Sequence, residues 1–165
     1  GDALLTNAFE IASKEEVLKL ENTTRCINIL SRQAGSEGMI RGQYIDLKVK
    51  TENFEKEKLF NLYRLKTGAL FLAACEIGAL LAGADEESLE SVKKYASKFG
   101  MSFQMIDDFL DGDFMLSDLI DGILVKDTIF KLLNECRNSV SKLKGDGFML
   151  NGLIDFIQEK LPCEN

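Results

Sequence analysis

The chain has 165 residues, 45% of them hydrophobic, and a formal net charge of −7, which is enough chain for one domain with a substantial core. This acidic balance argues against nucleic acid as a partner, because binding nucleic acid requires a basic face. Histidine is absent, so histidine general bases, Ser-His-Asp triads and histidine-containing zinc sites are excluded within this chain.

Apolar residues recur at helical spacing along almost the whole chain, and the one proline is Pro162. We predict helices over residues 2–12, 13–33, 38–49, 52–83, 86–112, 114–124, 127–143 and 148–161, with a break in the fourth helix near Thr67-Gly68. No segment shows the sustained alternation of a strand, and no linker divides the sequence. The prediction is therefore a single all-α domain spanning residues 1–165.

Three further patterns concern the cellular setting of the protein. The apolar run from Gly68 to Ala84 contains Glu76 and is rich in glycine and alanine, so we expect a buried core helix rather than a membrane span. The cysteines are scattered without a CxxC pair, which is typical of free thiols in a reducing compartment. The sequence does not open with the basic segment of a signal peptide. We therefore predict a cytoplasmic protein without stable membrane insertion.

The stretch Phe103–Asp111 places acidic side chains inside an apolar run. If it is helical, Asp107 and Asp111 share one face, and Asp108 is adjacent. One interpretation is a site for Mg²⁺, which binds one or two carboxylates together with waters and substrate phosphate oxygens. The other is a solvated acidic face near a helix end, and the spacing alone fits both. The metal interpretation gains support from the apolar neighbours and from the unfavourable position of aspartates at the negative end of a helix dipole.

Two other places suit phosphate binding or close helix packing. Lys66-Thr67 borders an apolar run, where the lysine can meet a diphosphate and the threonine can donate a hydrogen bond; a surface lysine at a helix kink is the alternative. Gly42 allows a neighbouring helix or a ligand to come close, and we favour helix packing there. Gln43 and Asp46 share one helical face, either as polar pocket residues or as a buried hydrogen-bonded pair.

In this order, the motifs resemble the trans-isoprenyl diphosphate synthases of the polyprenyl synthetase family, which includes farnesyl and geranylgeranyl diphosphate synthases. The most specific piece is FQMIDDFLD at 103–111, which resembles the family's second aspartate-rich motif. The supporting segments are GDALL at 1–5, GMIRGQYIDL at 38–47, YRLKTGAL at 63–70, LLAGAD at 80–85 and KFGMSFQMIDDFLDGD at 98–113. The resemblance covers nearly the whole chain.

The resemblance implies an isoprenoid-synthase type of all-α helical bundle, with a deep cavity among the helices and usually a homodimer. It also implies a prenyltransferase that condenses isopentenyl diphosphate head to tail with an allylic diphosphate in the presence of Mg²⁺, making short-chain isoprenyl diphosphates. In such a reaction, metal ions and basic groups stabilise the negative charge that develops on the leaving diphosphate.

The same resemblance assigns roles to residues of this chain. The aspartates of the FQMIDDFLD motif would bind Mg²⁺: Asp107, Asp108 and Asp111. Lys66 would contact the allylic diphosphate, while Thr67 and Gln104 would line the cavity beside the reacting carbons. These three are the candidate catalytic residues, and Gln43 is a further candidate for substrate binding.

Two parts of the family pattern are missing from this sequence. The family's first aspartate-rich motif and most of its isopentenyl diphosphate site lie upstream of the segment that resembles GDALL, where this chain begins. After Asp111 the family usually has a lysine-containing loop, whereas here Gly112-Asp113 runs directly into an apolar segment. We therefore expect the C-terminal part of a synthase, with the N-terminal helices absent. The alternatives are a non-catalytic homologous subunit that modulates a synthase and a helical binding bundle without turnover.

Overall fold

The computed structural model describes residues 1–14, 20–49, 56–112 and 122–161. Within these ranges the chain forms helices joined by turns, and no strand occurs there. The elements are α1 (Asp2–Ala12), α2 (Leu20–Ala34), α3 (Met39–Val49), α4 (Lys56–Tyr63), the π-helical turn η1 (Arg64–Gly68), α5 (Ala69–Leu81), α6 (Glu86–Asp111), α8 (Gly122–Val140) and α9 (Phe148–Gln158). The prediction of an all-α fold is confirmed.

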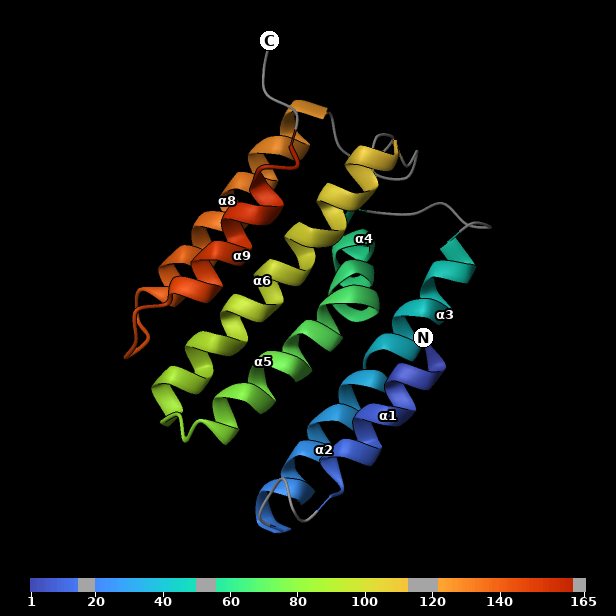
Figure 1. Ribbon diagram of the computed structural model, residues 1–165. Helices are drawn as coiled ribbons and strands as arrows, with labels where there is room; N and C mark the ends of the chain where they lie inside the picture. The colour runs from blue at the N-terminus through green and yellow to red at the C-terminus, as the bar shows by residue number, and fades with distance from the viewer. Residues whose placement is uncertain (15–19, 50–55, 113–121, 162–165) are drawn as a thin grey trace.

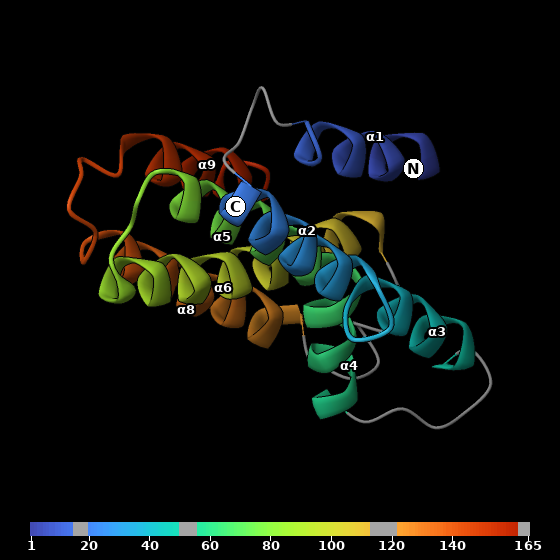
Figure 2. The ribbon, with the colours of Figure 1, turned by 90° about the horizontal axis from the view of Figure 1, so that it is seen from below.

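Helix α6 organises the arrangement of the other helices. It is 26 residues long and packs between α5 on one side and α8 on the other, with α9 against α8 (Figure 1). Helix α2 packs on α5, and α1 lies against α2 on the outside of the bundle (Figure 2). Helices α3 and α4 both contact η1, which in turn contacts α6. The layout therefore brings three separate segments to one end of α6.

The hydrophobic core lies mainly between α4, α6, α8 and α9. Its largest fully buried side chains are Tyr95, Leu59, Leu62, Met105, Ile129, Leu133, Ile154 and Ile157. The rings of Tyr95 and Phe99 stack with their centroids 5.5 Å apart, and Phe71 of α5 meets Phe99 edge-on at 5.2 Å. Aromatic pairs in these geometries add about 0.5–1.5 kcal/mol beyond their area burial. The Phe71–Phe99 pair joins α5 to α6.

The π-helical turn η1 and helix α6 approach each other through two glycines. A Cβ atom at Gly100 of α6 would lie only 2.6 Å from the Cα of Gly68, so a larger residue would push the two backbones apart. The close approach occurs one turn before Gln104 on α6 and immediately after Thr67. Backbone packing, rather than side-chain length, therefore sets the separation of these two polar residues.

The structure refines two of the predicted helix boundaries. The expected break near Thr67-Gly68 is the π-helical turn η1, so the chain passes from α4 to α5 without leaving helical geometry. The predicted helix 114–124 falls largely on residues outside the described part, but its end at Leu124 is wrong. Helix α8 continues past that point, and the Thr128 hydroxyl donates to the Leu124 carbonyl at 2.6 Å. No glycine or proline interrupts that segment, so nothing ends the helix there.

The described helices bear on the expectations about membrane and thiols. None of them is both long and apolar enough to cross a membrane. Cys26, Cys75 and Cys136 are free thiols, as predicted, while Cys163 lies outside the described residues. Burial raises the pKa of Cys136 to about 12, so this thiol stays protonated at neutral pH and is a poor nucleophile.

Both ends of α6 are capped in the way their sequences suggest. At the start, the Asp85 carboxylate accepts a hydrogen bond from the Ser88 backbone N–H at 2.9 Å and forms an ion pair with Lys144. At the end, Gly112 adopts the left-handed conformation with φ 67°, which only glycine adopts without strain. Asp107, Asp108 and Asp111 therefore occupy the last turns of the helix.

We expect the Asp85–Lys144 pair to contribute a pH-dependent part of the stability. Hydrogen bonds from Lys144 and then Ser88 hold the pKa of Asp85 well below its ordinary value. A carboxyl whose pKa is lowered by folding stabilises the native state above its unfolded pKa and loses that effect as pH falls through the folded pKa. Asp85→Asn keeps an N-cap but removes the charge, so its Tm should be below wild type at pH 7, and the difference should shrink as pH falls below the ordinary aspartate pKa of about 4 toward the lowered pKa of the folded state. Thermal unfolding across pH measures this; a deficit that stays constant with pH would contradict it.

Candidate functional site

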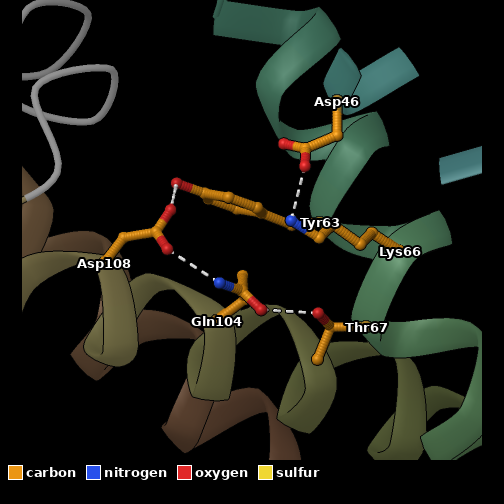
Figure 3. Close-up of polar contacts among 6 residues, drawn as sticks. All are labelled: Asp46, Tyr63, Lys66, Thr67, Gln104 and Asp108. Carbon is orange, nitrogen blue, oxygen red and sulfur yellow. Dashed lines mark hydrogen bonds and ion pairs between the residues drawn. The ribbon is translucent and has the colours of Figure 1, made fainter. Parts of the chain in front are cut away.

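The candidate site lies where α3, the end of α4 and η1 face the last turns of α6. Figure 3 shows its polar side chains, which come from three separate segments of the chain. Asp46 belongs to α3, Lys66 and Thr67 belong to η1, and Gln104 and Asp108 belong to α6. The structure thus brings together residues that are 20 to 45 positions apart in sequence.

The π-helical turn is held on two sides by backbone contacts. On one side, a Cβ atom at Gly42 of α3 would lie 2.3 Å from the Lys66 backbone nitrogen, so α3 can reach η1 only because this residue is glycine. On the other side lies the contact between Gly68 and Gly100. The prediction that Gly42 serves helix packing is confirmed. Short π-helical turns inside α-helices occur frequently at functional sites.

A chain of hydrogen bonds links η1 to α6. The Thr67 hydroxyl donates to Gln104 Oε1 at 2.5 Å, and Gln104 Nε2 donates to Asp108 Oδ1 at 2.7 Å. The Tyr63 hydroxyl donates to the other carboxylate oxygen, Asp108 Oδ2. Figure 3 shows these bonds in a continuous row. Each of these side chains makes a hydrogen bond to the next. The polar groups can therefore be partly buried without the cost of unpaired donors or acceptors.

Lys66 is held by a separate ion pair beside this chain. Its Nζ atom lies 2.7 Å from Asp46 Oδ2, and the two side chains are 35% and 19% exposed. The lysine is therefore fixed near the surface of the site but remains reachable from solvent. A partly exposed cation in this position can bind an anionic ligand if that ligand replaces Asp46 as its partner.

The acidic residues of the motif divide into two kinds. Asp107 and Asp111 are exposed, whereas Asp108 is half-buried and accepts from Tyr63 and Gln104. In the ranges that the structure describes, no three acidic or cysteine side chains stand close enough to hold a metal ion among them. Two carboxylates of the motif, those of Asp107 and Asp111, are open to solvent. This number is typical of Mg²⁺, which keeps several waters and substrate oxygens.

Gln43, Asp46 and Tyr63 differ in how far the sequence predicted their roles. Gln43 is exposed, and the Thr67–Gln104–Asp108–Tyr63 chain of hydrogen bonds among the described residues does not include it. The only indication of the Asp46–Lys66 pair in the sequence was the polar helical face that Asp46 shares with Gln43. Tyr63 had no signal in the sequence, because its partner Asp108 lies 45 residues away.

An apolar cavity of about 390 Å³ lies between α1, α2 and α5. All of its lining residues are apolar or small: Ala8, Ile11, Ala12, Cys26, Leu30, Leu70, Ala73, Ala74, Ile77 and Leu81. Leu70 stands three positions after Thr67, which is about one helical turn. The polar site and the apolar cavity are therefore neighbours along the same helix.

Comparisons of sequence agree on one family. The family model described as "Polyprenyl synthetase" matches residues 1–115. Farnesyl diphosphate synthase of Bacillus subtilis is 37% identical over 114 residues, which make up 67% of this chain and 38% of that protein. Geranylgeranyl diphosphate synthase of Methanosarcina mazei is 34% identical over 131 residues, which make up 74% of this chain and 40% of that protein.

Comparisons of structure extend the likeness to α8 and α9. An FPP/GFPP synthase of Zymomonas mobilis superposes with a TM-score of 0.86 at 29% identity, covering 94% of this chain and 58% of that one. A geranyltransferase of Helicobacter pylori, complexed with magnesium and isoprenyl diphosphate, gives 0.78 at 26% identity, covering 96% of this chain and 57% of that one. The predicted isoprenoid-synthase fold is confirmed. This chain spans less than two thirds of the length of each of these relatives.

We expect Thr67 and Gln104 to be energetically coupled. Thr67→Val and Gln104→Leu each remove one partner of the hydrogen bond between η1 and α6, and the double variant removes both. Leaving one buried partner unsatisfied costs more than removing the pair, so the double variant should be more stable than the sum of the single losses predicts, by about 0.5–1.5 kcal/mol. Urea unfolding of all four proteins measures this coupling, and additive losses would contradict it.

Proposed function

Since the chain belongs to the polyprenyl synthetase family, we propose that it provides the diphosphate-binding and ionising part of a trans-prenyltransferase. The reaction would be head-to-tail condensation of isopentenyl diphosphate with an allylic diphosphate. The observation that carries the proposal is the convergence of Lys66, Thr67 and Gln104 beside the end of α6 that bears Asp107 and Asp111. The site thus offers a cation, two dipoles and two carboxylates at one end of the bundle.

The exposed carboxylates fit Mg²⁺ as the resident metal. Asp107 and Asp111 stand one turn apart on α6, and both are oxygen ligands of the hard kind that Mg²⁺ prefers. We assign these two residues to the metal, whereas Asp108, which the sequence also predicts as a ligand, has both oxygens engaged by Tyr63 and Gln104. When bound, Mg²⁺ would neutralise charge on the diphosphate and so stabilise its departure.

The polar side chains of η1 and α6 would then act on the two ends of the allylic substrate. Lys66 would exchange its contact with Asp46 for the diphosphate, adding positive charge where negative charge develops. The Thr67 and Gln104 oxygens would face the carbon left positive after ionisation, where oriented dipoles stabilise charge without reorganisation. Gln43 is retained as a substrate contact at the outer edge of the site.

The apolar cavity offers a place for the hydrocarbon chain of the substrate. It begins near Leu70, one turn from Thr67, and continues between α1, α2 and α5. Each methylene transferred from water to such surroundings contributes about 0.8 kcal/mol. A diphosphate held at Lys66 with its hydrocarbon chain directed along α5 would therefore satisfy both ends of an allylic substrate.

A homodimer is proposed on similar grounds. Large apolar side chains are exposed on the first three helices of the chain, and they are Leu4, Ile11, Leu20, Ile40 and Leu47. If these side chains form one continuous patch, that patch would suit a protein–protein interface. The isopentenyl diphosphate site, the homodimer and a cytoplasmic location all stay predictions.

We expect Mg²⁺ and inorganic diphosphate together to raise the Tm more than either alone, because ligands that bind only the native state stabilise it, by about 2.7 kcal/mol at a hundredfold excess over Kd. Asp107→Asn should remove most of this shift. The matched control is Glu86→Gln, which removes one carboxylate at the other end of α6, about 30 Å away at 1.5 Å per residue. A shift that Asp107→Asn leaves intact, or no shift in the wild type, would contradict the metal assignment.

A turnover assay separates the enzyme from the alternative of a modulating subunit. The protein is incubated alone with Mg²⁺, labelled isopentenyl diphosphate and an allylic diphosphate, and extractable product is counted. We expect product without any partner protein, and Lys66→Ala should lower the rate by about 10²-fold or more because one charge on the leaving group is no longer stabilised. Product that forms only after a homologous synthase is added would favour the modulating subunit.

A further inference from the structure

Tyr63 is a buried residue whose hydroxyl group reaches the site. It is the last residue of α4, directly before η1, and its side chain is only 2% exposed. A buried tyrosine hydroxyl normally finds a hydrogen-bond partner, and here it donates to Asp108 Oδ2. Its ring is anchored in the hydrophobic core, so the hydroxyl position is set by packing rather than by a mobile side chain.

The two oxygens of Asp108 are both engaged with protein donors. Tyr63 donates to Oδ2 and Gln104 donates to Oδ1. The neighbouring carboxylates of Asp107 and Asp111 are exposed. At helical spacing all three lie within an arc of about 100°, with Asp111 in the middle. Rotation of Asp108 away from its donors would therefore bring a third carboxylate toward the other two.

We propose that Tyr63 is a positioning residue that keeps Asp108 out of the metal site, so that the site has two carboxylates rather than three. This inference rests on the proposed metal role of Asp107 and Asp111. Mg²⁺ is small and binds through one or two carboxylates and several waters, whereas Ca²⁺ takes six to eight oxygen ligands in flexible geometry. A third carboxylate would favour Ca²⁺, so Tyr63 determines the selectivity of the site for Mg²⁺.

The second hydrogen bond to Asp108, which Gln104 donates, fixes the orientation of Gln104. Because Asp108 can only accept, Gln104 must turn its amide nitrogen toward Asp108 and its oxygen toward Thr67. The bond lengths of 2.7 Å and 2.5 Å agree with this orientation. Release of Asp108 would leave the Gln104 amide free to rotate, and Thr67 would lose its fixed acceptor. Asp108 thus links the Tyr63 hydroxyl to the polar groups of Gln104 and Thr67.

The test compares metal selectivity in the full chain. Binding of Mg²⁺ and Ca²⁺ is measured by competition with Mn²⁺, whose unbound fraction is read by electron paramagnetic resonance, in the presence of inorganic diphosphate. Tyr63→Phe should shift the affinity ratio toward Ca²⁺ by roughly tenfold, the lower end of the effects that changes around a metal site typically cause. The double variant Tyr63→Phe/Asp108→Asn should return the ratio to that of the wild type, since the third carboxylate is no longer there.

Tyr95→Phe is the matched control. Tyr95 is 1% exposed, and its hydroxyl donates to the Leu150 carbonyl at 3.1 Å, away from the acidic motif. This change also removes one buried hydroxyl and its hydrogen bond, so it reproduces any general loss of stability. We expect it to leave the Mg²⁺/Ca²⁺ ratio unchanged. A purely structural role of Tyr63 would instead give the same small effect at both tyrosines.

A second variant tests the proposal even if Tyr63→Phe does not fold. With Tyr63 intact, Asp108→Asn should change the Mg²⁺ affinity by less than about threefold, because Asp108 is not a ligand. A loss of tenfold or more would show that Asp108 ligates the metal and would overturn the role of Tyr63. Wild-type protein that binds no Mn²⁺ would overturn the metal site itself. Wild-type binding with an unchanged ratio in folded Tyr63→Phe would overturn the Tyr63 proposal alone.

Discussion

The position of η1 between α3 and α6 is the constraint on which the candidate site depends. Gly42 lets the α3 backbone reach Lys66, and Gly100 lets the α6 backbone reach Gly68. A single extra carbon at either glycine would collide with backbone, which cannot move aside as a flexible side chain can. The positions of Lys66 and Thr67 are therefore set by the main chain. Such rigid placement is what preorganised electrostatic stabilisation requires.

Polar groups can be kept in this partly buried place because they satisfy one another. Thr67, Gln104, Asp108 and Tyr63 form a row in which every bond has one donor and one acceptor. Breaking one of these hydrogen bonds leaves a polar group without a partner in surroundings of lower dielectric than water. The four residues therefore stabilise the structure together rather than independently. These hydrogen bonds also join η1 to α6 across the interface between them. Packing and site geometry are thus two aspects of the same contacts.

Periodicity predicted the helices and placed Asp107 and Asp111 on one face, because helical spacing is a local property of the sequence. The order of short motifs indicated the family and marked Lys66, Thr67 and Gln104 as neighbours. The Tyr63–Asp108 and Asp46–Lys66 contacts were out of reach, since they depend on how distant segments pack. The π-helical turn was visible only as a break near Thr67, and the start of α8 was misjudged because a helix end was predicted at Leu124, where no glycine or proline stands.

The Asp46–Lys66 pair explains how an acidic protein with net charge −7 could accept an anionic substrate. The pair is partly exposed, and exposed ion pairs are worth only about 0.2–1 kcal/mol. Exchange of Asp46 for a diphosphate would therefore cost little, while the diphosphate brings more negative charge and more acceptor oxygens to the lysine. Until then, Asp46 holds the Lys66 side chain close to the position it needs. Asp46 thus pairs with the charge of Lys66 Nζ before the substrate arrives. Because it also holds this atom in place, it lowers the conformational cost of binding the substrate.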